Sequence, residues 1–169
     1  METSDTASSA GAAPHAHLQR LERVFVRNPV YFITTCTHGR ARLLDQAPAC
    51  AVLAQEWRTA CERHGWLIGR YVVMPDHVHF FCAPAPDGRA VKLAVFMQHW
   101  KEWTAKGLRA ACGIRPPVWQ KQFFDHVLRS HESYAEKWGY VRENPVRAGL
   151  VAQAAAWPYQ GWIDFDAPL

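Results

Sequence analysis

Two histidines separated by one apolar residue are the residues best suited to chemistry in this chain. They are His77 and His79, in the run Met74-Pro75-Asp76-His77-Val78-His79-Phe80-Phe81. Residues i and i+2 of a strand lie on one face. The β-branched and aromatic residues around them predict such a strand, with Val78 and Phe80 packed on a core. The two imidazoles are therefore predicted to project together, close enough that they could share one divalent cation. The alternative is that they are polar residues on the exposed side of a half-buried strand.

A second stretch, residues 140–151, begins with Tyr140 and continues through Asn144. Ser133 and Glu136 form a capping-box pattern, which predicts a helix that begins there. The helix is predicted to end near Asn144, because the residue before Pro145 is biased out of the α region. Tyr140 and Asn144 would then lie at i and i+4 on one helical face, with a phenol beside a carboxamide oxygen. The alternative is that Tyr140 is an ordinary aromatic residue of an amphipathic helix and Asn144 only marks its end.

With a third block, these stretches resemble the single-tyrosine HUH transposases, and in particular the REP-associated tyrosine transposases. The blocks occur in family order between about residues 31 and 151, and they are Met74-Pro75-Asp76-His77-Val78-His79, Trp119-Gln120-Lys121-Gln122-Phe123-Phe124-Asp125-His126-Val127-Leu128-Arg129, and Tyr140 followed by Asn144-Pro145-Val146-Arg147-Ala148-Gly149-Leu150-Val151.

The resemblance implies that Tyr140 is the nucleophile and that His77, His79 and Asn144 are metal ligands. Mg²⁺ or Mn²⁺ is the expected cofactor, although two imidazoles also suit Zn²⁺ or Ni²⁺. A glutamine is common at the Asn144 position among insertion-sequence relatives, so this ligand departs from the usual pattern. Asp125 and His126 match a family block, but no role is assigned to them.

The function implied is that of a metal-dependent transposase that nicks and rejoins single-stranded DNA near hairpins through a 5′-phosphotyrosine. One alternative is a domesticated protein that binds DNA hairpins without turnover, which has no need of a metal site and a nucleophile together. Another is a metal phosphodiesterase that uses water, for which Tyr140 would be dispensable. The expected partner is single-stranded DNA with hairpins, and the chain is expected to act as a monomer or a homodimer.

Basic residues gather in one part of the chain. From residue 89 to residue 129 there are eight Lys or Arg and two acidic residues, with tryptophans between them. Such a stretch is typical of a surface that binds phosphates and stacks unpaired bases. The alternative is a solvated helix face over a tryptophan-rich core. The predicted DNA contacts are Lys101, Lys106, Arg109, Lys121, Arg129 and Arg147.

Length and composition indicate one globular domain. The chain has 169 residues, of which 49% are apolar and 20% charged, with a net charge of +4. No apolar run approaches the roughly 20 residues of a membrane helix, and no signal peptide is recognisable. The five cysteines are scattered, which favours a reducing compartment, and a cytoplasmic location is expected. Residues 1–18 are predicted to be a disordered tail, and residues 19–169 a single catalytic domain.

The elements expected to position these residues have the order β-α-β-β-α-β. Strands are predicted over residues 23–37, 66–74, 77–82 and 118–128, and helices over residues 48–64, 90–108 and from residue 133. This order predicts an α+β ferredoxin-like sandwich, with one antiparallel sheet and helices on one face. The resemblance adds that the Tyr140 helix packs across the sheet near the histidines.

Overall fold

One antiparallel sheet forms the centre of the computed structural model, which describes residues 29–128 and 131–167. Its strand order is β4-β1-β3-β2-β5. The strands are β1 (Val30–Cys36), β2 (Trp66–Met74), β3 (His77–Pro84), β4 (Phe124–Leu128) and β5 (Gln160–Trp162). The first four strands and their helices follow the predicted β-α-β-β-α-β order, so the α+β class and the antiparallel sheet are confirmed.

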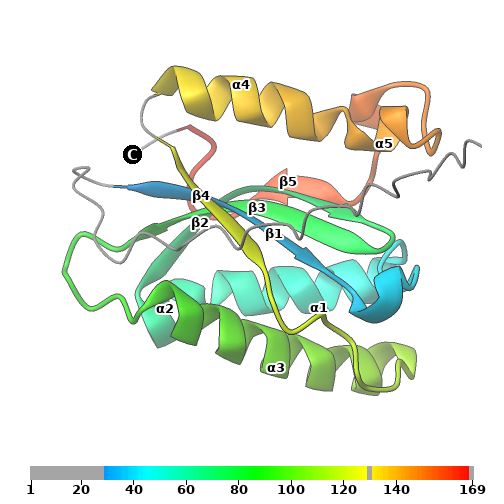
Figure 1. The fold of residues 1–169 in the computed structure, drawn as a ribbon, viewed down its shortest axis with the longest axis horizontal. Coiled ribbons are helices and arrows are strands. Elements are labelled where there is room, and N and C mark those ends of the chain that lie inside the picture. The colour runs from blue at the N-terminus through cyan, green and yellow to red at the C-terminus, as the bar shows by residue number, and fades with distance from the viewer. Residues whose placement is uncertain (1–28, 129–130, 168–169) are drawn as a thin grey trace, which may run out of the picture.

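Helices cover both faces of the sheet (Figure 1). On one face lie α1 (Ala47–Arg58), α2 (Ala60–His64) and α3 (Leu93–Cys112), and on the other lies α4 (His131–Arg142). Helices on a single face were predicted for the sandwich itself, and α4 adds a layer to the opposite face. That layer is possible because the central strands carry apolar side chains on both faces of the sheet. Phe80 belongs to the core under α1 and α3, and Phe81 belongs to the core under α4.

The long helix α3 forms because its apolar residues recur once per turn. Its buried residues are Phe96, Met97, Trp100, Thr104 and Leu108, which make one stripe along the helix. Gly113 ends the helix in the left-handed conformation, with φ of 67°, and its N–H donates to the Arg109 carbonyl. The tryptophan-rich core on this side also includes Trp57, which stacks on Trp100.

The turn between β2 and β3 is short and is held from outside. Met74 pairs with His77, so only Pro75 and Asp76 lie between the strands. The N–H groups of Leu43 and Leu44 donate to the Pro75 carbonyl at 2.8 and 2.9 Å. Thr37 donates to the Asp76 carbonyl from its N–H and its hydroxyl, at 2.9 and 3.0 Å. These bonds fix where β3 begins, and therefore which of its residues face α4.

Several predicted boundaries were wrong. The helix predicted over residues 48–64 is interrupted at Thr59, which separates α1 from α2. Only the last part of the strand predicted over residues 118–128 pairs along β1, and Trp119 makes a single bridge to Thr37. Helix α4 spans His131–Arg142, so Ser133 lies within its first turn and not before the helix. Strand β5 was not predicted, because three residues carry no periodicity.

Other predictions concern parts of the chain outside the described residues. These are the tail over residues 1–18 and the beginning of the strand predicted over residues 23–37. Short 3-10 turns, η1 (His38–Arg40) and η2 (Ala154–Ala156), and the one-turn helix α5 (Asn144–Arg147) complete the elements. Within residues 29–128 and 131–167, no helix has the length and apolar character needed to cross a membrane.

Candidate active site and nucleic-acid interface

The two histidines of β3 project from the sheet toward the α4 side. Val78 and Phe80 are fully buried in the core under α1 and α3, so the alternating residues His77 and His79 point the other way. Their ring centres are 4.7 Å apart and the rings are nearly perpendicular, at 84°. Both side chains are partly buried. The structure therefore brings the two imidazoles together as predicted, between the sheet and the second helix layer.

Each imidazole is held through its Nδ1 atom. His77 Nδ1 lies 2.6 Å from a carboxylate oxygen of Asp76, and His79 Nδ1 lies 2.8 Å from the hydroxyl of Thr34. Arg40 pairs with the other Asp76 oxygen at 2.9 Å. In metal sites the ring nitrogen opposite the ligating one is usually bonded in this way, which fixes the tautomer and the ring orientation. The arrangement leaves each Nε2 as the nitrogen suited to a metal.

Both imidazoles are predisposed to the neutral form. Burial lowers the pKa of His79 to about 3, and nearby positive charges, including His77 and Arg147, add to the effect. Burial also lowers the pKa of His77, and the Asp76 carboxylate opposes this only in part. A neutral imidazole is the form that ligates a metal. The pair thus fits a divalent cation, but no third His, Cys, Asp or Glu joins it among the residues that the structure describes.

Tyr140 lies near the C-terminal end of α4 with 64% of its surface exposed. The guanidinium carbon of Arg147 lies 4.1 Å from the centre of its ring, and an Arg147 nitrogen donates to the Tyr140 carbonyl at 2.7 Å. Helix α4 begins beyond the C-terminal end of β4 and runs back over the sheet (Figure 1). Its C-terminal end therefore lies toward the end of the sheet at which β3 begins.

Asn144 lies in α5 and not in the same helix as Tyr140, which corrects the predicted single helix. Helix α4 ends at Arg142, and Pro145 occupies the first turn of α5, where a missing N–H costs nothing. Arg147 still connects the two residues, because it donates to the Asn144 side-chain oxygen as well as to the Tyr140 carbonyl. The ammonium of Lys137, on α4, lies 5.2 Å from the centre of the Phe32 ring, and Phe32 stacks on His79 with ring centres 5.4 Å apart, so α4 is close to the imidazoles.

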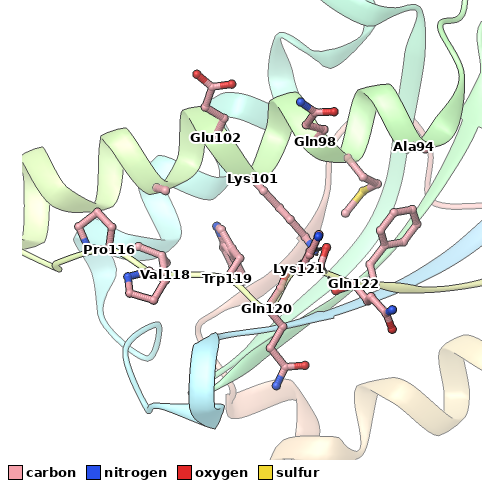
Figure 2. A pocket seen from close by; sticks show the side chains of 14 residues that line it. Ala94, Gln98, Lys101, Glu102, Pro116, Val118, Trp119, Gln120, Lys121 and Gln122 are labelled. Atoms are coloured by element: carbon pink, nitrogen blue, oxygen red, sulfur yellow. Dashed lines mark hydrogen bonds between the residues drawn. The ribbon is translucent and has the colours of Figure 1, made fainter. Parts of the chain in front are cut away.

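The predicted DNA contacts have different surroundings. Lys101 is partly buried, and its ammonium donates to the carbonyls of Gln120, Lys121 and Gln122 at 2.8, 3.3 and 2.9 Å. It reaches across a groove of about 740 Å³ between α3 and residues 116–123 (Figure 2). Lys106 pairs with Glu102 at 2.7 Å. Its ammonium also lies 4.5 Å from the centre of the Trp103 ring.

The remaining basic residues of that set are exposed, are held by neighbours or lie outside the described residues. Arg109 and Lys121 are exposed, and Arg129 lies outside the described residues. Arg147 is held against Tyr140 and Asn144, as described above. The basic residues on α3 lie on the far side of the sheet from the histidines, because α3 and α4 cover opposite faces. They do not form one continuous surface with the imidazole pair.

Thr34, Asp76 and Arg40 are the site residues that sequence reasoning missed. Asp76 could have been found, because it precedes His77 within a two-residue turn. Thr34 could not, because its contact depends on β1 pairing with β3 so that Thr34 lies directly opposite His79.

Comparison with known proteins places this geometry in a family. Residues 25–142, well over half of the chain, match the family model described as "Transposase IS200 like". A REP-associated tyrosine transposase of Escherichia coli (strain K12) is 32% identical over 93 residues, which are 54% of this chain and 52% of that protein. The matched part thus spans about half the length of that relative.

A solved structure of a REP-associated tyrosine transposase bound to a REP hairpin has the same fold. It superposes with a TM-score of 0.63 at 24% identity, covering 85% of this chain and 82% of that one. At this level of identity the likeness concerns the fold alone.

Proposed function

The chain belongs to the IS200-like transposase family, and we propose that it nicks and rejoins single-stranded DNA near hairpins through a 5′-phosphotyrosine on Tyr140. His77 and His79 would hold a divalent metal, Mg²⁺ or Mn²⁺, with Asn144 as a third ligand. The chain would act in the cytoplasm. The hairpin is proposed because the REP-associated tyrosine transposase with this fold is bound to a REP hairpin.

The observation that carries the proposal is the arrangement around Arg147. Its guanidinium contacts Tyr140 and Asn144, and its charge acts on His79. This arrangement supports the proposal, because the tyrosine proposed as nucleophile and the imidazoles proposed as ligands lie toward the same end of the sheet, although β3 and α4 are about sixty residues apart in the sequence. A divalent cation at the imidazoles would polarise a phosphate and offset the negative charge that develops on it.

The residues of the chain account for the rest of the reaction. The Tyr140 oxygen attacks phosphorus, the bond from phosphorus to the 3′ oxygen breaks, and the fragment leaves with a 3′-OH. The phenol loses one proton and the 3′ oxygen gains one, so the step is balanced. The phosphotyrosine ester keeps the energy of the broken bond, and attack by a 3′-OH reverses the step without ATP. Arg147, beside the ring, is placed to pair with the phosphate as this happens.

Asn144 has two roles open to it in this proposal. As a metal ligand Asn144 would have to turn its side-chain oxygen away from Arg147, from which that oxygen accepts a hydrogen bond. As a partner of Arg147 it would instead orient the guanidinium and leave coordination positions for the DNA phosphate and water. Measured Mn²⁺ affinity separates these roles, because Asn144→Asp supplies a better cation ligand and keeps an acceptor for Arg147. Tighter Mn²⁺ binding by this variant would support the ligand role, and an unchanged affinity would support the role as a partner of Arg147.

The test uses hairpin-bearing single strands labelled at either end. We expect a 3′ label to move onto the protein, a 5′ label to stay on a free fragment that ends in 3′-OH, and peptide mapping to find the nucleotide on Tyr140. Tyr140→Phe keeps the ring under Arg147, so it should bind the DNA and form no adduct. Cleavage by this variant at the wild-type rate would support the phosphodiesterase that uses water. Binding without cleavage by the wild-type protein under all metal conditions would support the hairpin binder.

A further inference from the structure

Phe124, the first residue of β4, has an exposed aromatic side chain at the end of the sheet where the imidazole pair lies. It is 45% exposed, whereas the preceding Phe123 packs against the core under α1 and α3. Strand β4 lies at the edge of the sheet, and within the described residues it pairs only with β1. Successive residues of a strand point to opposite faces, so Phe124 points to the α4 side.

The register of the sheet puts Phe124 in the same row as His79. Thr34 of β1 pairs with Phe124 on one side and with His79 on the other. Directly opposed residues of antiparallel strands project from the same face. Leu128, four residues further along β4, belongs to the core under α4, which agrees with this assignment. Two strand spacings separate Phe124 from His79, so their backbones are about 10 Å apart.

The residues around this row suit the binding of a negatively charged DNA strand. His126, two residues further along β4, is also exposed on this face. It pairs with Phe32, and the ammonium of Lys137 from α4 lies 5.2 Å from the centre of the Phe32 ring. Asp125 points the other way, and its charge acts on Tyr31 and Cys82 on the opposite face. The face around Phe124 thus combines an open aromatic ring, an imidazole and a cation.

We propose that Phe124 is a stacking platform for an unpaired base of the DNA substrate, next to the nucleotide whose phosphate lies at His77 and His79. The DNA strand would cross the edge of the sheet over β4, with His126 and Lys137 toward the phosphate backbone of the DNA. This inference rests on the proposed function and deepens it. It assigns a contact with the substrate to the block that contains Phe124, Asp125 and His126. Stacking on an aromatic ring tolerates any base, so Phe124 would supply affinity and position without sequence preference.

The test is a double-mutant cycle between the protein and the DNA. An abasic site is moved one nucleotide at a time along a hairpin-bearing single strand, and binding is measured for the wild type and for Phe124→Ala. We expect Phe124→Ala to bind the intact strand roughly 5- to 150-fold more weakly, in line with the loss of one stacked base. One abasic position should weaken wild-type binding by a similar factor and leave Phe124→Ala unaffected. Phe124→Trp should restore binding, and its fluorescence should be quenched by DNA.

The matched control is Trp162→Ala. Trp162 is another open aromatic residue, 57% exposed, but it lies on β5 at the opposite edge of the sheet. Its loss should leave DNA binding within twofold of wild type. Equal losses from both substitutions, or no abasic position that couples to Phe124, would overturn the stacking role.

Two further readouts separate this inference from the function on which it rests. Formation of the Tyr140 adduct by the wild type is scored in the same reactions. An adduct without coupling to Phe124 would refute only the stacking platform, and absence of any adduct would refute the proposed function. Light scattering on Phe124→Ala tests the competing role of this edge strand. A change in oligomeric state with unchanged DNA affinity would assign Phe124 to a contact between proteins.

Discussion

Replacing Lys101 by Met should destabilise the fold, although sequence analysis predicted a DNA contact at this position. An ammonium has three donors, and in this structure it meets three carbonyls, those of Gln120, Lys121 and Gln122. Met keeps most of the aliphatic chain and removes all three bonds. Hydrogen bonds to a charged group are worth about 1.5–3 kcal/mol each. Because these bonds share one partly exposed group, we expect a combined loss of about 2 kcal/mol in the free energy of unfolding.

Urea and thermal unfolding provide the assay. For a chain of this size a loss of about 2 kcal/mol lowers the melting temperature by about 4–8 °C. Lys106→Met is the matched control on the same helix, because Lys106 makes an exposed pair with Glu102, and such pairs contribute about 0.3–0.5 kcal/mol. The reasoning is refuted if Lys101→Met has the melting temperature of the wild type and its DNA binding depends less on salt concentration. That result would make Lys101 the phosphate contact predicted from the sequence.

Three further predictions concern metal, pH and charge. Asp76→Asn should weaken Mn²⁺ binding about 10- to 100-fold in calorimetry, because the carboxylate that holds His77 is lost; Asp87→Asn, in an exposed ion pair, should leave it unchanged. Near pH 6.5 His79 stays neutral in the folded protein, whereas the imidazole of the unfolded chain takes up a proton. The free energy of unfolding should therefore fall as the pH falls below about 6.5, by at most about 1.4 kcal/mol per pH unit. Urea titrations from pH 7 to pH 5 measure this, and His79→Gln should reduce the slope. Lys121→Gln, at an exposed cation, should reduce the salt slope of DNA binding by about one counterion, and an unchanged slope would remove Lys121 from the interface.

The parts of the fold that local patterns govern could be predicted from the sequence. Alternation around His77 and His79 predicted a strand with both imidazoles on one face, and the structure confirms this. Helical spacing over residues 90–108 predicted α3, but Val95 and Trp103, which are among the residues that indicated it, are exposed, and the buried stripe consists of other residues. Both patterns depend only on neighbours along the chain, which is why they could be recognised without the fold.

The rest depends on pairing between distant segments. Thr34 is a partner of His79 only because β1 and β3 pair in one particular register. Lys101 looked like a phosphate contact because charge alone is visible in a sequence, whereas the three carbonyls that surround it are not. Asn144 was placed in one helix with Tyr140 because Pro145 was expected to end that helix, but a proline is equally suited to begin the next one.

The turn of Pro75 and Asp76 makes this region sensitive to changes of length more than to changes of residue type. With four bonds from Thr37, Leu43 and Leu44 holding its carbonyls, the turn cannot absorb an added or deleted residue. A shift of one position would turn Val78 toward α4 and both imidazoles into the tryptophan-rich core. An in-frame gain or loss of one codon here would therefore abolish the proposed metal site and half of the core at once. In the loop that joins β3 to α3, residues 86–89 are exposed, so the same change at that tip would leave both intact, and variation in length has room there and none at the turn.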